Sequence, residues 1–199
     1  RNMMRMEEVV PEASESSLQH LITDGAWDHR AVLGQVQCDA DRLLGGQADS
    51  CLIIDESAMA KKGRHSAGVA RQWNGRLGKV DNCQIGVFAA LAQGHRAALV
   101  DARLYLPKEW TDDADRCQKA RIPEAERVFR SKSAIALEMI ADAKAAGTRF
   151  GCVLADGGYG KEPSFLRGIE RLDLRFLVEV HRNQRVFLES PQLHIPERT

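Results

Sequence analysis

Two short apolar runs in this 199-residue chain each end at an aspartate. Residues 51–54 are followed by Asp55, and residues 152–155 are followed by Asp156. Continuous runs of this kind predict strands that are buried on both faces of a sheet. A carboxylate at the end of a buried strand is costly unless it is paired or binds a metal ion. On neighbouring strands the two carboxylates repel each other unless a divalent cation lies between them. The pair therefore predicts a site that holds two Mg²⁺ ions for phosphoryl transfer, one to activate the attacking oxygen and one to stabilise the leaving oxygen.

The order of the expected elements predicts an α/β fold. Residues 1–47 are expected to be a helical lead-in, with a short helix that Gly25 ends and a longer helix from Asp28 to Gly45. The later elements are expected as strands at 51–55, 82–92 and 96–106, a helix at 131–146, a strand at 150–155, a helix from Pro163 and a strand at 174–180. Three strands followed by alternating helices and strands predict a mixed sheet flanked by helices. This is the order of the ribonuclease-H-like fold, in which the first and fourth strands are neighbours, so Asp55 and Asp156 are expected side by side.

A basic, glycine-punctuated segment follows the first strand and is expected to be a loop. Its charged residues are Lys61, Lys62, Arg64, Arg71, Arg76 and Lys79, and residues 57–80 contain no Asp or Glu, so six positive charges minus none give +6. Lys and Arg neutralise phosphates, and glycines let the backbone approach them. The segment therefore predicts a track for the DNA backbone beside the metal site, with a solvated charged loop as the alternative. Lys161, shortly after Asp156, is a further expected phosphate contact.

Several other features of the sequence limit the functions and locations that are expected for this chain. Residues 107–123 are expected to be irregular, and the acidic run at 112–115 to be solvated surface, since it has no hydrophobic support. The five cysteines lie at least 13 residues apart and are expected to be buried thiols in a reducing cytosol. No apolar run approaches membrane length, so no membrane partner is expected. A cytoplasmic location is expected, and the family resemblance described next implies a bacterial cell and association with the nucleoid.

Several of these motifs together resemble a known family. The segments that carry the resemblance are residues 53–57, 61–63, 68–72, 75–84, 103–107 with Trp110, and 155–160. They closely resemble the DDE transposases of bacterial insertion sequences, specifically the insertion-sequence-701 group within the broader insertion-sequence-4 relatives. The resemblance extends across nearly the whole chain.

The resemblance implies a function and a set of site residues. It implies a ribonuclease-H-like catalytic core, cleavage of element ends that depends on Mg²⁺ (or Mn²⁺), and strand transfer into target DNA, and it allows a homodimer in a synaptic complex. Asp55 and Asp156 match the first two catalytic carboxylates, which are also metal ligands. The third, a glutamate, is implied on a later helix beyond a β-rich insertion, whose start is expected at residues 182–199. Residues 48–181 are then a partial catalytic core, and residues 1–47 the tail of a DNA-binding region, so the chain is expected to be truncated at both ends.

Three functions remain open from the sequence. The first is a transposase, which as this 199-residue chain is predicted to be inactive or nearly so because it has two of three metal ligands. The second is an inactive module that binds DNA through the basic segment. The third is a ribonuclease-H-like nuclease that acts on RNA hybrids and is not a transposase.

Overall fold

The computed structural model describes residues 3–184, and the chain divides into two compact units, Arg1–Val36 and Gln37–Thr199. The first unit contains α1 (Met3–Glu7) and α2 (Glu15–Thr23), and α3 (His29–Leu44) starts in it and ends in the second unit. Ser14 caps α2 by accepting a hydrogen bond from the Ser17 N–H. The expected helices before residue 47 are therefore present, although the domain limits at 47 and 181 remain a prediction.

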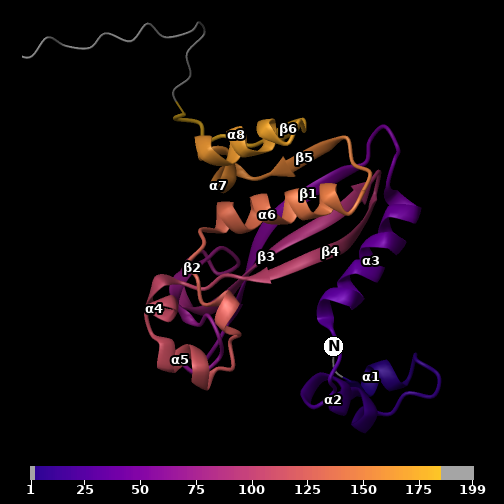
Figure 1. The fold of residues 1–199 in the computed structure, drawn as a ribbon, viewed down its shortest axis with the longest axis vertical. Coiled ribbons are helices and arrows are strands. Elements are labelled where there is room, and N and C mark those ends of the chain that lie inside the picture. The colour runs from indigo at the N-terminus through magenta and orange to yellow at the C-terminus, as the bar shows by residue number, and fades with distance from the viewer. Residues whose placement is uncertain (1–2, 185–199) are drawn as a thin grey trace, which may run out of the picture. The chain divides into compact units, whose positions relative to one another are not determined.

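The second unit is built on a six-stranded mixed sheet (Figure 1). Its strands are β1 (Cys51–Ala60), β2 (Ala70–Asn74), β3 (Lys79–Gln93), β4 (Arg96–Leu104), β5 (Cys152–Ala155) and β6 (Phe176–Val178). The path through the sheet is β2-β3-β1-β5-β6, and β4 also pairs with β3. The β3 strand is antiparallel to β1, β2 and β4, whereas β1, β5 and β6 run parallel. The expected mixed sheet is confirmed, including the adjacency of the strands that precede the two aspartates.

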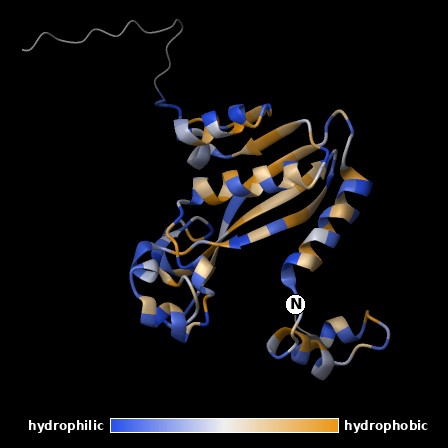
Figure 2. Cartoon of the chain, in the orientation of Figure 1, coloured by the Kyte–Doolittle hydropathy of each residue, from blue (hydrophilic) through white to orange (hydrophobic). Residues whose placement is uncertain are grey.

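One face of this sheet is buried under helices. Leu52 of β1 pairs with Leu91 of β3 and with Val153 of β5, and all three side chains are fully buried. They pack in one hydrophobic core with α6 (Lys132–Ala145), α8 (Pro163–Arg171) and the end of α3. Gly168 lets α8 approach α6 closely, because a Cβ there would lie 2.4 Å from a Leu137 methyl carbon. Figure 2 shows the hydrophobic colouring concentrated in the central strands.

The other face of the sheet carries an apolar row. Ile53 pairs with Ala90 and Leu154, and beyond them Ala90 pairs with Leu99 and Leu154 with Leu177. Paired residues point to the same face, so these five side chains line up across five strands. Leu99 and Leu177 at the two ends of the row are largely exposed.

A second, smaller core lies beyond the far end of β1. It contains Val69, Leu106, Trp110, Cys117 and Ile122, and it joins the loop after β1 to α4 (Lys108–Thr111) and α5 (Ala114–Lys119). The expectation of irregular structure at 107–123 was wrong. Local polarity suggested a loop, but the buried Trp110 anchors two short helices, and Asp113 caps the second by accepting from the Arg116 N–H.

Two other expectations need correction. β1 does not stop at Asp55, because its pairing with β3 continues from Asp55–Phe88 to Ala60–Cys83. The basic segment is not one loop either, since residues 70–74 form β2 on the outer side of β3.

Of the cysteines, Cys83 and Cys117 are buried, Cys51 and Cys152 are half-buried and Cys38 is exposed. Within the described residues no helix is long and apolar enough to cross a membrane. The expected insertion at 182–199 lies mostly outside the described part of the chain.

Candidate active site and DNA-binding surface

The two aspartates predicted as metal ligands lie side by side. Ile54 of β1 pairs with Ala155 of β5 in parallel register, so the next residue on each strand is an aspartate. Both line one hollow of about 460 Å³, together with Glu179, which directly follows β6. Asp156 is at the end of its strand, as predicted, whereas Asp55 is in the middle of a longer one.

Backbone donors hold both carboxylates in place. Asp156 is the N-cap of the one-turn helix α7 (Gly157–Gly160), and its Oδ1 accepts hydrogen bonds from the N–H groups of Gly158 and Tyr159 at 2.9 and 3.4 Å. Oδ1 of Asp55 accepts from the Glu56 N–H at 2.7 Å. In the described part of the chain neither Oδ2 atom has a hydrogen bond. Each aspartate therefore offers one oxygen toward a further ligand.

The surroundings of Asp55 and Asp156 disfavour a negative charge on both carboxylates when no cation neutralises them. Burial raises the pKa of Asp55 above its ordinary value, the Glu56 N–H opposes this, and the charges of Asp156 and Glu56 raise the pKa further. A cation between the carboxylates removes this repulsion. Among the described residues, however, no group of three or more His, Cys, Asp or Glu is placed to hold a metal ion. Glu179 lines the hollow without completing such a group.

Glu56 points to the opposite face of β1 and belongs to a separate cluster. Its carboxylate pairs with the Lys132 ammonium of α6 at 2.6 Å. Tyr159 is buried nearby against Phe165, and its hydroxyl has no hydrogen-bond partner within the described residues. Burial and the neighbouring charge of Glu56 raise the pKa of Tyr159. The packing of Tyr159 on Phe165 of α8 fastens α7, and with it Asp156, to the body of the domain. No local sequence pattern pointed to this cluster, because its members are far apart along the chain.

The predicted phosphate contacts occupy a different place from the one expected. β1 continues for five residues beyond Asp55, so Lys61 lies roughly 20 Å further along the strand direction at about 3.3 Å per residue. Lys61, Lys62 and Arg64 lie in the loop after β1, Arg71 in β2, Arg76 in the β2–β3 turn and Lys79 at the start of β3. Lys161 is the C-cap residue of α7, the one-turn helix whose N-cap is Asp156. The cations of the basic segment therefore do not lie beside the aspartates.

Polar side chains outside the prediction hold the backbone of the basic loop. Asn82 donates from its amide to the carbonyls of Lys61 and Gly63 at 2.7 and 2.9 Å. Gln84 donates to the Ala67 carbonyl, and the Trp110 indole to the Val69 carbonyl. Asn82, Gln84 and Trp110 all occur in the segments that carry the family resemblance, but their role could be seen only once the loop was in place. In this loop Lys62 and Arg64 are exposed, whereas Lys61 is half-buried.

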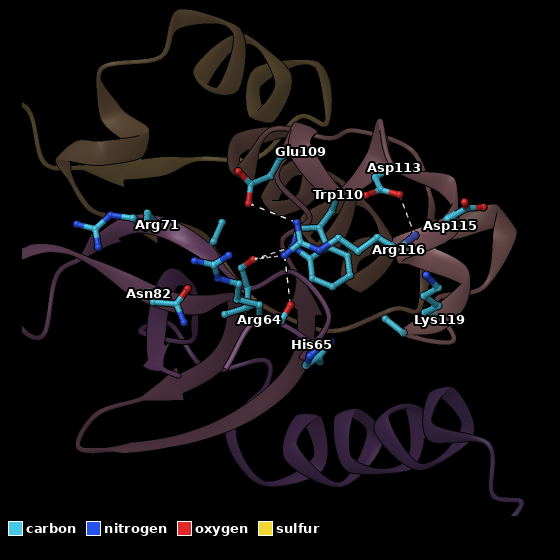
Figure 3. Close-up of a pocket in the computed structure, with 13 residues that line it drawn as sticks. Arg64, His65, Arg71, Asn82, Glu109, Trp110, Asp113, Asp115, Arg116 and Lys119 are labelled. Carbon is cyan, nitrogen blue, oxygen red and sulfur yellow. Dashed lines mark hydrogen bonds and ion pairs between the residues drawn. The ribbon is translucent and has the colours of Figure 1, made fainter. Parts of the chain in front are cut away.

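A cleft of about 870 Å³ lies between this loop and the α4–α5 helices (Figure 3). Arg64 and Arg71 line it from the basic segment, and Lys119 lines it from α5. In the described part of the chain these three cations have no ion pair. Arg116 lies over the Trp110 ring at 3.9 Å, pairs with Glu109 and donates to the carbonyls of Arg64 and Val69. Arg116 therefore holds the cleft together. Three carboxylates, Glu109, Asp113 and Asp115, also line the cleft. Among the described residues, Arg64, Arg71 and Lys119 are its cations without an ion pair, and they are the groups available for an anion.

Comparisons with known proteins identify the family of this chain. The family described as DDE superfamily endonuclease matches residues 1–199. The chain belongs to this family. It is also 29% identical over 186 residues to a protein of Microchaete diplosiphon described as a probable transposase for insertion sequence element IS701. That match covers 92% of this chain and 44% of the relative, so the chain spans less than half of the relative's length. The resemblance to DDE transposases of the insertion-sequence-701 group is confirmed by these two findings.

A solved structure also resembles this DDE-family chain, at a lower level. It is a Drosophila P element transposase strand transfer complex, with 11% sequence identity and a TM-score of 0.28, and the match covers 84% of this chain and 38% of the other.

Proposed function

We propose that this chain is the catalytic core of a transposase that cleaves and joins DNA, with Asp55 and Asp156 as metal-binding catalytic residues. The observation that carries the proposal is the parallel register of β1 and β5, which brings two aspartates together in a family of DDE endonucleases. We also propose a ribonuclease-H-like classification. It is supported by a sheet in which β1 has an antiparallel hairpin on one side and parallel strands on the other.

The donor set of the hollow suits a hard divalent cation. Two carboxylate oxygens, one from each aspartate, have no other partner among the described residues, and the two charges repel each other. Mg²⁺ takes oxygen ligands, commonly from one or two carboxylates with water and substrate phosphates filling the other positions. Mn²⁺ accepts the same ligands. Asp55 and Asp156 would therefore hold the ion.

The residues of the chain have separate tasks in this proposal. When bound, two such ions would supply the chemistry, one by activating the attacking oxygen and the other by stabilising the leaving oxygen of the phosphodiester. The Gly158 and Tyr159 N–H groups orient the Asp156 carboxylate, and the Glu56 N–H orients that of Asp55. Lys161, the C-cap residue of α7, is proposed to bind a phosphate of the strand that enters the hollow. The cations of the basic segment hold the DNA at a distance from the reacting bond, which fixes the position of the duplex.

A second function is favoured by one observation. The described residues contain no third carboxylate that completes the metal group. A chain of these 199 residues is therefore expected to bind DNA and a metal ion but to cleave DNA weakly or not at all. A nuclease that acts on RNA hybrids is the remaining alternative, and a preference for hybrids over DNA duplexes would favour it.

Two measurements on the 199-residue chain test the proposal. The first is the change in melting temperature on adding Mg²⁺ or Mn²⁺, which should be positive for the wild type and absent for Asp55→Asn and Asp156→Asn. Asp112→Asn is the matched control, because Asp112 is an exposed carboxylate with no part in the hollow. If Asp112→Asn alone abolished the effect, the ion would bind elsewhere.

The second measurement is DNA affinity as a function of salt. Contact with about four to six phosphates predicts a slope of the logarithm of affinity against the logarithm of salt concentration between about −3.6 and −5.4. A slope near zero would refute the proposed DNA partner.

A further inference from the structure

An exposed tryptophan lies on the basic hairpin formed by β2 and β3. Trp73 in β2 is 59% exposed, whereas Trp110 is fully buried and forms the small core beside it. Trp73 pairs across the hairpin with Val80, which is also exposed. Trp73 therefore contributes little to the core of the domain, and its aromatic face is open to a ligand.

The tryptophan shares its face of the hairpin with the lining of the cleft. Side chains alternate along a strand, so Arg71 points to the same side as Trp73, and the Arg71–Asn82 pair lies next to the Trp73–Val80 pair. Arg71 and Asn82 both line the cleft in Figure 3. The unpaired cations of the cleft and the exposed aromatic ring therefore form one continuous surface.

The charge of the hairpin selects the class of ligand. Residues 70–82 contain Arg71, Arg76 and Lys79 against Asp81, so three positive charges minus one negative charge give +2. A polyanion with planar apolar groups complements such a surface. Bases within a duplex are covered by their neighbours, whereas an unpaired base has a free face that stacks on an aromatic side chain.

We propose that Trp73 stacks on an unpaired base of DNA while Arg71, Arg64 and Lys119 bind phosphates of the same strand. This inference rests on the proposed DNA-binding function and adds to it a preference for single-stranded or unpaired DNA. It also assigns a binding role to Lys119, which lies in the segment 107–123 that was predicted to be irregular.

Tryptophan fluorescence of the full 199-residue chain tests the stacking. The chain has three tryptophans, of which Trp110 is buried and Trp27, at 45% exposure, lies in the other unit. A short oligothymidylate should quench the wild type and the Trp27→Phe control to a similar extent, and Trp73→Phe much less. Persistence of the full quench in Trp73→Phe would overturn the proposal.

Affinity for the same oligothymidylate tests the chemistry of the contact. Trp73→Leu keeps an apolar side chain but removes the aromatic face, so it should weaken binding roughly 5- to 150-fold, whereas Trp73→Phe should retain most of the affinity. A matched duplex should lose much less affinity in Trp73→Leu. Lys119→Gln should weaken binding of the single strand and lower its salt slope by about 0.7. Equal affinity of Trp73→Leu and the wild type for the single strand would refute the stacking.

The outcomes separate this inference from the proposed function. If Trp73→Leu changes nothing while duplex binding keeps its salt slope, the stacking fails and the DNA partner stands. If the wild type binds no DNA at all, both fail. If Trp73→Leu instead abolishes self-association in light scattering without affecting DNA affinity, a second copy of the chain occupies the surface and the inference is wrong.

Discussion

Replacing Gly160 by alanine should displace the short helix that carries Asp156. A Cβ at position 160 would lie 2.0 Å from the Glu179 carbonyl oxygen, an atom of the backbone that cannot rotate away. Overpacking of this kind costs about 1–3 kcal/mol. Gly157→Ala is the matched control in the same turn, because its Cβ would meet nothing closer than 3.7 Å.

The comparison between the two variants isolates the clash. Both substitutions remove a glycine from α7, so both change the helix propensity and the entropy of the unfolded chain in the same direction. The free energy of unfolding should therefore be lower in Gly160→Ala than in Gly157→Ala by about 1–3 kcal/mol. Urea denaturation followed by circular dichroism measures it, and with a slope of about 2 kcal/mol per molar the midpoint should differ by roughly 0.5–1.5 M.

The same pair of variants links the packing of α7 to the proposed metal site. Asp156 caps α7, so a displaced helix should also lower the stabilisation that Mg²⁺ gives to Gly160→Ala, while Gly157→Ala should respond like the wild type. Equal urea midpoints for the two variants would refute the reasoning, because the contact between α7 and the segment after β6 would then not be tight.

Three further predictions follow from individual contacts. Asp55→Asn should raise the melting temperature in metal-free buffer at neutral pH. The raised pKa of the Asp55 carboxyl group favours folding below the ordinary aspartate pKa, and this contribution is lost as the pH rises through the folded-state pKa. The higher melting temperature of the variant should therefore vanish in acid. Ser131→Ala removes the cap of α6, whose hydroxyl accepts from the Ala134 N–H, and should cost about 1 kcal/mol in urea denaturation, an effect that Ser131→Asn should largely avoid. Arg103→Met should lower the free energy of unfolding by roughly 2 kcal/mol, since the Arg103 side chain is 13% exposed and pairs with Asp101, Glu138 and Asp142. An unchanged urea midpoint would show that these ion pairs contribute nothing to stability.

Much of the fold could be predicted because its signals are local. The helix over residues 132–145 begins at a serine cap, the helix from Pro163 begins with a residue whose fixed φ suits a first turn, and the β3–β4 hairpin turns at Gly94. The runs before Asp55 and Asp156 are apolar on successive residues, which indicated buried strands without any knowledge of their partners. These features depend on neighbours within a few positions along the chain.

The rest of the fold depended on partners distant in sequence. Residues 56–60 contain one large apolar side chain, Met59, and gave no strand signal, yet β3 continues to pair with them and extends β1. Residues 107–122 read as a loop, but the Trp110 indole binds the Val69 carbonyl across 41 residues and holds two helices against the basic loop. A single sequence without its tertiary pairing does not contain this information.

The sequence by itself determined which residues could perform the chemistry: two aspartates after apolar runs, and a segment of six cations without a carboxylate. Only the tertiary structure decided how they are arranged. Parallel pairing of β1 with β5 makes the aspartates neighbours, because equal register puts the residue after Ile54 beside the residue after Ala155. The continuation of β1 carries the cations of the basic segment away from the two aspartates. The packing of Trp110 holds α5 against the basic loop, and Lys119 of α5 thereby lines the cleft between them. The physical reason is that carboxylate and cation types are local properties of the chain, whereas their separation is fixed by hydrogen bonds and buried contacts between distant segments.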